Sequence, residues 1–404
     1  MISIQQALET ISAHQPPAET CRMQLAEALE RVVAEDIPAP EPLPRYTDSA
    51  MDGFAVRWSD FEGGEEGAAV TLSVIGESRA GEPFRAVVQP GEAVRISTGA
   101  ALPADTDTVV PVEDVEEEEQ RISIRSTVHK QQYVRFEGEE IQAGETLLER
   151  GTRLTPAGLG LLASIGARTV TVFRPPTTAV IVTGSELVTP DDEIQPWQSR
   201  ESNGIMLAAA VCQSGGEVTF SEHCGDRLEA TRRAIASAFQ AARILLISGG
   251  VSVGPHDLVK QAAQEEGFET LFWKVRQKPG KPLFFAKKAD RLLFGLPGNP
   301  VSALNCYVYY VHPLLQKMQG REFNWDILTG TLAEEVENRG ERSLFLRVQI
   351  IERDDGMMRV IPIKKQGPHM LSSMALADGF LLLEPGQKLP EGEEVGVHLY
   401  PWKR

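Results

Sequence analysis

Positive charge is scarce in this chain. Its 404 residues contain 40 lysines and arginines against 57 aspartates and glutamates, which gives a formal net charge of −17. A chain with that balance repels the phosphates of DNA and RNA, and its sequence shows no basic segment interleaved with aromatic residues, so we expect no nucleic-acid partner. An anionic ligand would have to be held by a local cluster of cations.

Long apolar runs and paired cysteines are lacking too. The chain has no stretch of about 18 or more apolar residues, so we expect no membrane span. Its first residues, MISIQQALET, lack the basic and apolar parts of a secretory signal. Its four cysteines, Cys21, Cys212, Cys224 and Cys306, show no CxxC pair and no zinc-type spacing. We therefore expect reduced, mostly buried thiols in a cytoplasmic protein.

The chain is long enough for several domains, and its pattern changes along its length. Helical spacing of apolar residues over 2–35 predicts helices at 4–11 and 25–32. Residues 45–140 contain short strands between Gly and Pro turns, with the acidic run EDVEEEEQ as a solvated hairpin or sheet edge. The segment GTRLTPAGLGLLASIG, at 151–166, predicts a further helix.

Apolar strands alternate with helices between about 175 and 320. The strands are predicted by TTAVIVTG, EVTFSEHCGD, RILLISGG, ETLFWKV and RLLFGLPG. Such strands indicate a parallel sheet covered by helices on both faces, and sheets of this kind bind ligands beyond the carboxyl ends of their strands. From about 325 onward, the alternation in SLFLRVQII, MMRVIPI and EVGVHLY predicts a small β-barrel or sandwich.

The loop SGGVSVGPHD follows one of these strands and ends on a carboxylate. Gly249 and Gly250 allow close backbone approach and positive φ, so their N–H groups can form an anion-binding nest. Ser252 adds a hydroxyl at the same place. Asp257 cannot bind an anion directly but suits Mg²⁺ beside a phosphate. A tight turn that ends in a helix-capping acid explains the same loop equally well.

Lysines gather around a second turn, KVRQKPGKP. Lys274, Lys278 and Lys281 lie within eight residues of one another, while Pro279 and Pro282 stiffen the turn. A rigid basic loop beside a glycine-rich nest can hold an oxyanion. An ordinary exposed cluster of lysines is the alternative.

A third loop joins a buried strand to a helix. It contains Pro297, Gly298, Asn299, Pro300 and Ser302. Pro300 suits the first turn of the helix, and Ser302 either caps that helix or binds a ligand.

Two more acids follow strands, Glu186 in TGSEL and Asp226 in CGDRLE. Together with Asp257 they can converge on one crevice and coordinate a divalent metal for phosphate chemistry. Asp226 can alternatively cap the helix that begins near Leu228. In the β-rich segment, the turns in DSAMDGFAV, ISTGAALP and VRFEGEEIQAGETLL indicate no particular reaction by their local spacing.

Seven elements in this order resemble the MoeA-type molybdopterin molybdenumtransferases, the family that also includes the E domain of gephyrin. The elements are DSAMDGFAV, ISTGAALP, GEEIQAG, TGSEL, SGGVSVGPHD, KPGKP and LPGNPVS, and they span nearly the whole chain. The resemblance implies a transferase that inserts molybdate into adenylylated molybdopterin and releases AMP, the last step of molybdenum cofactor biosynthesis, with Mg²⁺ as cofactor. It also implies a homodimer that contacts a molybdopterin adenylyltransferase and molybdoenzyme maturation proteins.

The resemblance further implies a multidomain fold. We expect a mixed helical and β linking domain at 1–44 and 141–174, a β-rich lid domain at 45–140, a parallel α/β molybdopterin-binding domain of the MogA type at 175–322, and a C-terminal β-barrel domain at 323–404.

Roles for individual residues come from the same resemblance. The SGGVS and LPGNP loops would cradle the pterin nucleotide, and Asp226, Asp257 and Glu186 would bind Mg²⁺ and take part in cleavage of the adenylate. The oxyanion pocket for molybdate would contain Lys278, Lys281, Pro282, Ser252, Ser302 and Arg347, with Lys274 nearby. Asp52, Thr98, Arg135 and Glu140 match functional positions that act across the dimer interface.

The chain departs from the family pattern at a few positions. Glu140 stands where many relatives have aspartate, and Pro368 stands where a serine is expected, so Ser372 or Ser373 would have to replace that hydroxyl. Three other functions remain open: an adenylyltransferase, which shares only the α/β domain; a homologue that inserts tungstate; and a non-catalytic scaffold.

Overall fold

A computed structural model describes residues 1–62, 69–251, 258–353 and 356–403. The chain divides into two units, which are described separately. The first contains Met1–Ala34, Arg153–Thr155 and Thr169–Arg404, and the second contains Glu35–Thr152 and Pro156–Arg168. The finer limits of the four expected domains stay a prediction.

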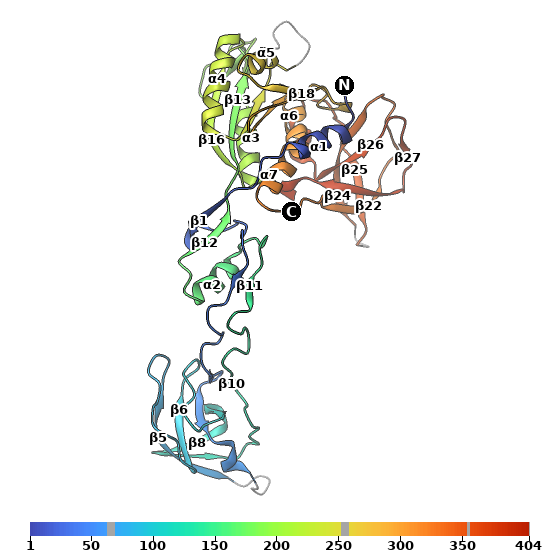
Figure 1. Ribbon diagram of the computed structural model, residues 1–404. Helices are drawn as coiled ribbons and strands as arrows, with labels where there is room; N and C mark the ends of the chain where they lie inside the picture. Colours follow the sequence, from blue (N-terminus) through green and yellow to red (C-terminus); the bar gives the residue numbers. More distant parts are fainter. Residues whose placement is uncertain (63–68, 252–257, 354–355, 404) are drawn as a thin grey trace. The chain divides into compact units, whose positions relative to one another are not determined.

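The first unit is built on a six-stranded sheet (Figure 1). Its order is β16 (Glu217–Cys224), β13 (Thr177–Thr183), β17 (Ile244–Ser248), β21 (Arg291–Leu296), β20 (Phe284–Lys288) and β18 (Glu269–Trp273). The first four strands are parallel, as predicted, and the α/β fold class is confirmed. β20 was not predicted from the sequence, and it lies antiparallel to both of its neighbours.

Helices cover both faces of this sheet, which explains its apolar strands. On one face, Val180 and Leu246 pack in a core with α3 (Asn203–Gln213) and with the continuous helical segment made of α6, a π-helical turn and α7. On the other face, Ile181 and Leu245 pack against helices α4 and α5. The bounds of these elements are α4 Leu228–Ala241, α5 Leu258–Glu265, α6 Pro300–Cys306, the π-helical turn Tyr307–Val311 and α7 His312–Met318.

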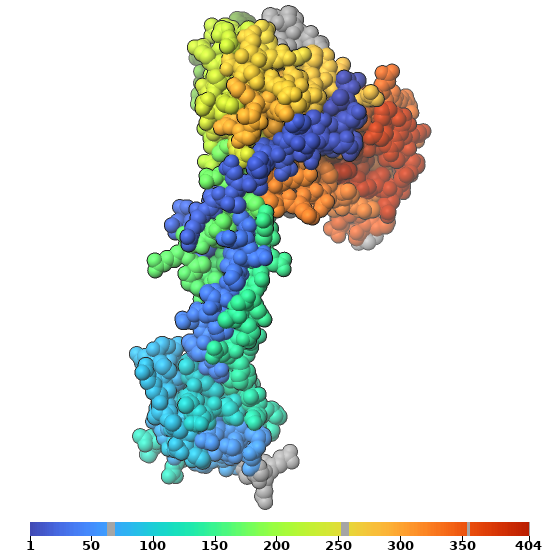
Figure 2. All heavy atoms as spheres, in the orientation of Figure 1, coloured from blue at the N-terminus to red at the C-terminus, as the bar shows by residue number. Residues whose placement is uncertain are grey.

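The N-terminal segment adds one helix to the first unit. α1 (Ile4–Ala13) begins with a capping box formed by Ser3 and Gln6, and its buried residues join the core around α6 and α7. Figure 2 shows this helix, in dark blue, lying between the α/β domain and the C-terminal domain.

The second helix predicted in this segment is wrong. Residues Thr20–Gln24 form β1, which pairs antiparallel with β12 (Thr169–Phe173), and only the short 3₁₀ turn Leu25–Glu27 follows. Glu30 has a positive φ of 67°, a conformation that no α-helix contains. The buried apolar residues here serve long-range strand pairing, which overrides their helical spacing.

A closed barrel of strands follows in the C-terminal domain, as predicted. Going around the barrel, β24 (Ser343–Glu352) is followed by β25 (Met358–Pro362), β22 (Ile327–Leu332), β28 (Glu394–Leu399) and β26 (Gly379–Leu383), which pairs again with β24. The parallel pairing of β19 (Gln277–Lys278) with β24 joins the barrel to the α/β domain. Smaller elements are β23 (Val336–Glu337), β27 (Lys388–Leu389), α8 (Leu371–Leu376) and the 3₁₀ turn Pro401–Lys403.

The second unit contains another six-stranded sheet. Its order is β7 (Thr108–Pro111), β4 (Gly53–Val56), β6 (Glu92–Ile96), β5 (Val70–Ser78), β9 (Arg121–Ile124) and β8 (Val115–Glu118). The acidic run lies in β8 at the edge of this sheet, as predicted. The unit also contains β2 (Ile37–Pro38), β3 (Asp48–Ser49), β10 (Val134–Arg135), β11 (Thr146–Leu148), α2 (Pro156–Ser164) and the 3₁₀ turns Trp58–Phe61 and Val112–Asp114.

Cysteine pairing and membrane crossing can be checked in the described residues. All four cysteines are free thiols, of which Cys224 and Cys306 are buried, Cys21 is half-buried and Cys212 is exposed, so the expectation of mostly buried thiols holds for two of them. No helix in the described part of the chain has the length and hydrophobicity needed to cross a bilayer.

Candidate functional site

A pocket of about 580 Å³ lies beyond the carboxyl ends of β13, β17 and β21. This is the position at which parallel α/β sheets bind ligands. We call it the glycine-rich pocket. Its lining includes many of the predicted residues: Glu186, Asp226, Gly249, Gly250, Pro282, Pro297, Gly298, Asn299 and Pro300.

Glycine is required in the turn after β17. Gly249 has a φ of 96°, and a Cβ atom built on it would lie 2.5 Å from the backbone oxygen of Thr183. A Cβ atom on Gly298 would lie 3.7 Å from the Cα atom of Gly249. The turns after β17 and β21 therefore approach each other backbone to backbone, as a cradle for a ligand requires.

The acids of this pocket are held in defined positions. The backbone N–H of Ser185 donates to Oδ2 of Asp226 over 3.0 Å, and the N–H of Asp226 donates back to Oγ of Ser185 over the same distance. The N-cap of α4 is Arg227, without a side-chain capping bond, so Asp226 does not cap that helix. Glu186 lines the same pocket, and these two carboxylates are oxygen donors of the kind that Mg²⁺ prefers.

Asp257 and Ser252 lie outside the described residues. Among the residues that are described, no group of three or more potential metal ligands occurs. The expected convergence of Glu186, Asp226 and Asp257 therefore stays a prediction, supported by the common pocket of its first two members.

Two polar residues of the pocket escaped the sequence analysis. Thr183 and Asn203 are 6% and 7% exposed, and neither Oγ1 of Thr183 nor Oδ1 of Asn203 has a hydrogen-bond partner among the described residues. The amide nitrogen of Asn203 donates to Oγ of Ser248 and to the carbonyl of Gly298, both over 2.8 Å, which fixes the side-chain orientation. A threonine that ends a strand and an asparagine that begins a helix are common without function, so the sequence carried no signal.

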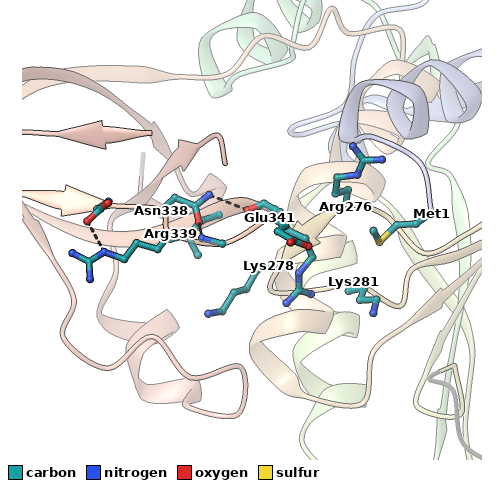
Figure 3. Close-up of a pocket in the computed structure, with 11 residues that line it drawn as sticks. Met1, Arg276, Lys278, Lys281, Asn338, Arg339 and Glu341 are labelled. Carbon is teal, nitrogen blue, oxygen red and sulfur yellow. Dashed lines mark hydrogen bonds and ion pairs between the residues drawn. The ribbon is translucent and has the colours of Figure 1, made fainter. Parts of the chain in front are cut away.

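A second pocket, of about 910 Å³, lies between the β19 segment and the loop Glu337–Arg342 of the C-terminal domain (Figure 3). We call it the basic pocket. Lys278 and Lys281 line it as part of a basic set that was only partly predicted. The charged side chains in its lining are Arg276, Lys278, Lys281, Arg339 and Arg342, against Glu337 and Glu341.

The two pockets differ in charge. Among the described residues, the glycine-rich pocket contains Glu186, Glu201 and Asp226 against one cation, Arg200. This arginine donates 2.7 Å hydrogen bonds to the carbonyls of Thr189 and Asp192. The basic pocket contains an excess of cations. Lys281 lines the basic pocket and the next residue, Pro282, lines the glycine-rich one, so the KPGKP turn separates them.

Three of the predicted residues described in the first unit lie outside both pockets. The ammonium of Lys274 lies 3.7 Å from the ring centroid of Trp273, a cation–π contact. Ser302 is buried within α6, whose N-cap is Asn299, so the capping alternative for Ser302 is wrong. Pro300 occupies the first turn of this helix, as predicted.

Arg347 is the third of these residues, and it is buried. The residue is 2% exposed, its guanidinium donates a long bond of 3.4 Å to the carbonyl of Gly367, and Nε has no partner among the described residues. Burial lowers the pKa of Arg347. The loop that accepts this bond also contacts α6, because the N–H of Val301 donates to the carbonyl of Pro368 over 3.2 Å. Arg347 and the start of α6 thus contact the same loop, at Gly367 and Pro368.

Three of the four predicted residues of the second unit form side-chain contacts: Asp52 with Thr98, and Arg135 with Asp48. Oδ1 of Asp52 accepts hydrogen bonds from the backbone N–H of Thr98 over 2.6 Å and from its hydroxyl over 3.0 Å. Both bonds, the backbone one more strongly, lower the pKa of Asp52. Arg135 pairs with Asp48 over 2.6 Å. Glu140 is exposed, and its backbone N–H donates to the carbonyl of Leu43.

Family models match three parts of the chain. The MoeA N-terminal region (domain I and II) matches residues 2–166, a probable molybdopterin binding domain matches 179–317, and the MoeA C-terminal region (domain IV) matches 329–400. The two outer matches lie beyond the α/β domain, so the likeness is not confined to that domain.

Individual relatives are similar along nearly their whole length. The molybdopterin molybdenumtransferase of Haemophilus influenzae is 35% identical over 98% of both chains, and that of Bacillus subtilis is 30% identical over 96% of this chain and 91% of the relative. A solved MoeA protein of molybdopterin biosynthesis from Pyrococcus horikoshii has a TM-score of 0.82 and 28% identity, with 99% of this chain and 100% of that chain covered. The chain therefore belongs to the MoeA family of molybdopterin molybdenumtransferases.

Proposed function

We propose that this protein is a molybdopterin molybdenumtransferase, which inserts molybdate into adenylylated molybdopterin with Mg²⁺-dependent release of AMP. One observation supports this function above the others. A glycine-rich pocket with carboxylates and a basic pocket lie on either side of the short KPGKP turn. A reaction between a pterin nucleotide and a metal oxyanion needs two such sites next to each other, because the two substrates repel each other in solution.

The glycine-rich pocket is the proposed site of the pterin nucleotide. Gly249 and Gly298 let the backbone approach the ligand closely, and Pro300 begins a helix whose first N–H groups favour negative charge. The unpartnered oxygens of Thr183 and Asn203 are free to accept hydrogen bonds from N–H groups of the ligand. The pocket can thus bind both the phosphate and the heterocyclic parts of such a molecule.

The residues present fit a magnesium ion. Mg²⁺ is usually bound by one or two carboxylates together with water and substrate phosphates, and Glu186 and Asp226 supply two carboxylates in one pocket. Asp257 is the proposed third ligand. When bound, the ion would neutralise phosphate oxygens as AMP leaves. The protein would hold both carboxylates in the glycine-rich pocket and the lysines in the basic pocket.

Molybdate is proposed to bind on the lysine side of the KPGKP turn. Lys278 and Lys281 line the basic pocket and no described carboxylate forms an ion pair with them, so their charges are available to a dianion. Arg347, which the resemblance assigns to the same oxyanion pocket, is buried outside the basic pocket, where its guanidinium contacts the loop that also contacts the start of α6. Pro368 offers only its carbonyl, and that is bonded to Val301, so no hydroxyl comes from this position.

We extend the proposal to a homodimer. Asp52, Thr98, Arg135 and Glu140 belong to the second unit and would complete the site of the partner subunit, with Arg135 held by Asp48. Delivery of the adenylylated substrate and removal of the product would involve contacts with an adenylyltransferase and with maturation proteins of molybdoenzymes. Molybdate and tungstate have nearly the same size and charge, so either oxyanion fits the basic pocket.

Reconstitution tests the proposed function. Purified protein is incubated with adenylylated molybdopterin, Mg²⁺ and molybdate, and AMP release is measured together with activation of an apo-molybdoenzyme. We expect both signals, and only when molybdate is present. AMP release without active cofactor would indicate a hydrolase or a tungstate enzyme, and no AMP release would favour a scaffold. Adenylate formation from ATP and molybdopterin would indicate an adenylyltransferase instead.

A further inference from the structure

The basic pocket contains two arginines that form no ion pair in the described part of the chain. Arg276 is exposed and Arg342 is half-buried, and neither forms an ion pair with any described carboxylate. Arg339 lines the same pocket but is already paired with Glu337 over 2.6 Å. In a chain with a net charge of −17, unpaired cations around one cavity are the feature that needs an explanation.

The backbone around these arginines is fixed by hydrogen bonds. The N–H of Arg276 donates to the carbonyl of Ile2 over 2.9 Å, and its carbonyl accepts from Ser343 over 3.2 Å. Nη1 of Arg342 donates to the carbonyl of Gln277 over 3.3 Å, which holds the guanidinium beside β19. The pairing of β19 with β24 anchors both segments. The two arginines are therefore held on the same rigid framework that carries Lys278.

The size of the pocket indicates how it would act. Its volume of about 910 Å³ is many times that of one tetrahedral oxyanion. An anion in it would keep much of its water shell, so the pocket attracts by its charge rather than by close coordination. Surface charges of this kind raise the local concentration of an ion and the rate of its capture.

We propose that the basic pocket is an entry chamber for a tetrahedral oxyanion, in which Arg276 and Arg342 draw molybdate toward Lys278 and Lys281. This inference rests on the proposed function for the identity of the oxyanion. Arg276 and Arg342 are positioning residues: they raise the occupancy of the lysine site and do not take part in the transfer itself. Glu341, which lies in the same lining without an ion pair to a described residue, opposes them.

Binding of molybdate to the full-length protein tests this directly. Equilibrium dialysis at low ionic strength is performed on the wild type and on Arg276→Gln and Arg342→Gln. We expect each variant to bind roughly threefold to tenfold more weakly, as for the loss of one steering charge, and the difference to shrink as salt is raised. Unchanged binding in both variants would overturn the proposal.

Arg339→Gln is the matched control. It removes the same charge from the same pocket, but from a side chain that is 84% exposed and therefore strongly screened by solvent, so we expect a smaller effect than for Arg342→Gln. Glu341→Gln should have the opposite effect and strengthen binding. If Arg339→Gln weakens binding as much as Arg342→Gln, total charge matters and the position of the arginines does not, which contradicts the proposal.

Competition and kinetics identify the anion and the role. Molybdate and tungstate should compete for the arginine-dependent site, while tight binding of phosphate with none of molybdate would overturn the assignment. In the AMP-release assay, the arginine variants should lower kcat/KM for molybdate and leave kcat at saturation unchanged. A parallel loss of kcat would mean that the arginines act in the chemical step.

The proposed function and this inference can fail separately. Arginine-dependent molybdate binding in a protein that makes no cofactor would contradict only the transferase proposal. An active transferase whose molybdate affinity does not depend on Arg276 or Arg342 would contradict only the entry chamber.

Discussion

Single polar atoms distinguish the glycine-rich pocket from an ordinary strand-end turn. A buried hydroxyl or amide oxygen without a partner costs about 1–3 kcal/mol, and Thr183 and Asn203 both contain such an atom in this pocket. The hydrogen bonds of Asn203 to Ser248 and Gly298 leave its oxygen as the free end of the amide. A sequence cannot reveal such atoms, because their cost depends on neighbours that only the fold brings together.

Thr183→Val should change stability and ligand binding in opposite directions. Valine has the same shape and removes an unpartnered hydroxyl, so the free protein should unfold at the same or a slightly higher temperature. Binding of adenylylated molybdopterin should weaken about threefold to tenfold if that hydroxyl contacts the ligand. Thermal unfolding and isothermal titration measure the two effects, and Thr183→Ser is the control that keeps the hydroxyl. A loss of stability with unchanged binding would make the threonine purely structural.

The pKa of Asp52 should depend on the side chain of Thr98. The pKa of Asp52 lies below its ordinary value of 3.8 because Thr98 donates two hydrogen bonds to the charged form. Because the pKa is lower in the folded state, the ionised carboxylate stabilises the folded protein at pH values above the ordinary pKa. This stabilisation is lost as the pH falls through the pKa of the folded state. Thr98→Val removes only the hydroxyl bond, so the pKa should rise part of the way. An NMR titration of the Asp52 carboxyl checks this, and an unchanged pKa would contradict it.

At the scale of elements, the sequence pattern predicted the positions of strands better than it predicted which strands pair with each other. β13 and β17 were recognised because both of their faces are buried, and β25 and β28 of the barrel because burial alternates along most of their length. The helix expected at 25–32 was wrong since Glu30 has a positive φ and Val32 forms a β-bridge with Arg153, a residue far away in the sequence. β20 (Phe284–Lys288) was not predicted, and in the sheet it lies between β18 and β21 and pairs antiparallel with both. Long-range pairing is the part that local spacing does not encode.

The turn after β17 should not tolerate a side chain at Gly249. Gly249→Ala places a methyl group against the backbone oxygen of Thr183 and retains a positive φ, so we expect a loss of more than about 1–3 kcal/mol in unfolding free energy. Gly392→Ala is the matched control, because Gly392 has a φ of 84° with no atom near the added carbon. Urea unfolding of both variants separates the cost of the contact from the cost of the conformation. Equal losses would show that the close approach to Thr183 is unimportant.

At the scale of the whole molecule, the structure distributes the described acids and lysines of the candidate site over two pockets. The sequence analysis predicted a crevice for the acids and a basic loop beside the glycine-rich turn. In the structure, Glu186 and Asp226 line the glycine-rich pocket, whereas Lys278 and Lys281 line the basic one. The division depends on the pairing of β19 with β24, which brings a loop of the C-terminal domain against the lysines. Under the proposed function, each anion would be bound and positioned in its own pocket.

Separate pockets also predict separable defects. Lys281→Ala should raise the KM for molybdate about tenfold and leave the affinity for adenylylated molybdopterin nearly unchanged, because Lys281 lines only the basic pocket. Asp226→Asn should abolish the stimulation by Mg²⁺ while molybdate binding persists, and its remaining oxygen can still accept the bond from Ser185. Steady-state kinetics with each substrate varied in turn, together with dialysis of molybdate, measure both defects. If each variant impaired both substrates equally, the two pockets would act as one site, and the charge separation that supports the proposed function would be lost.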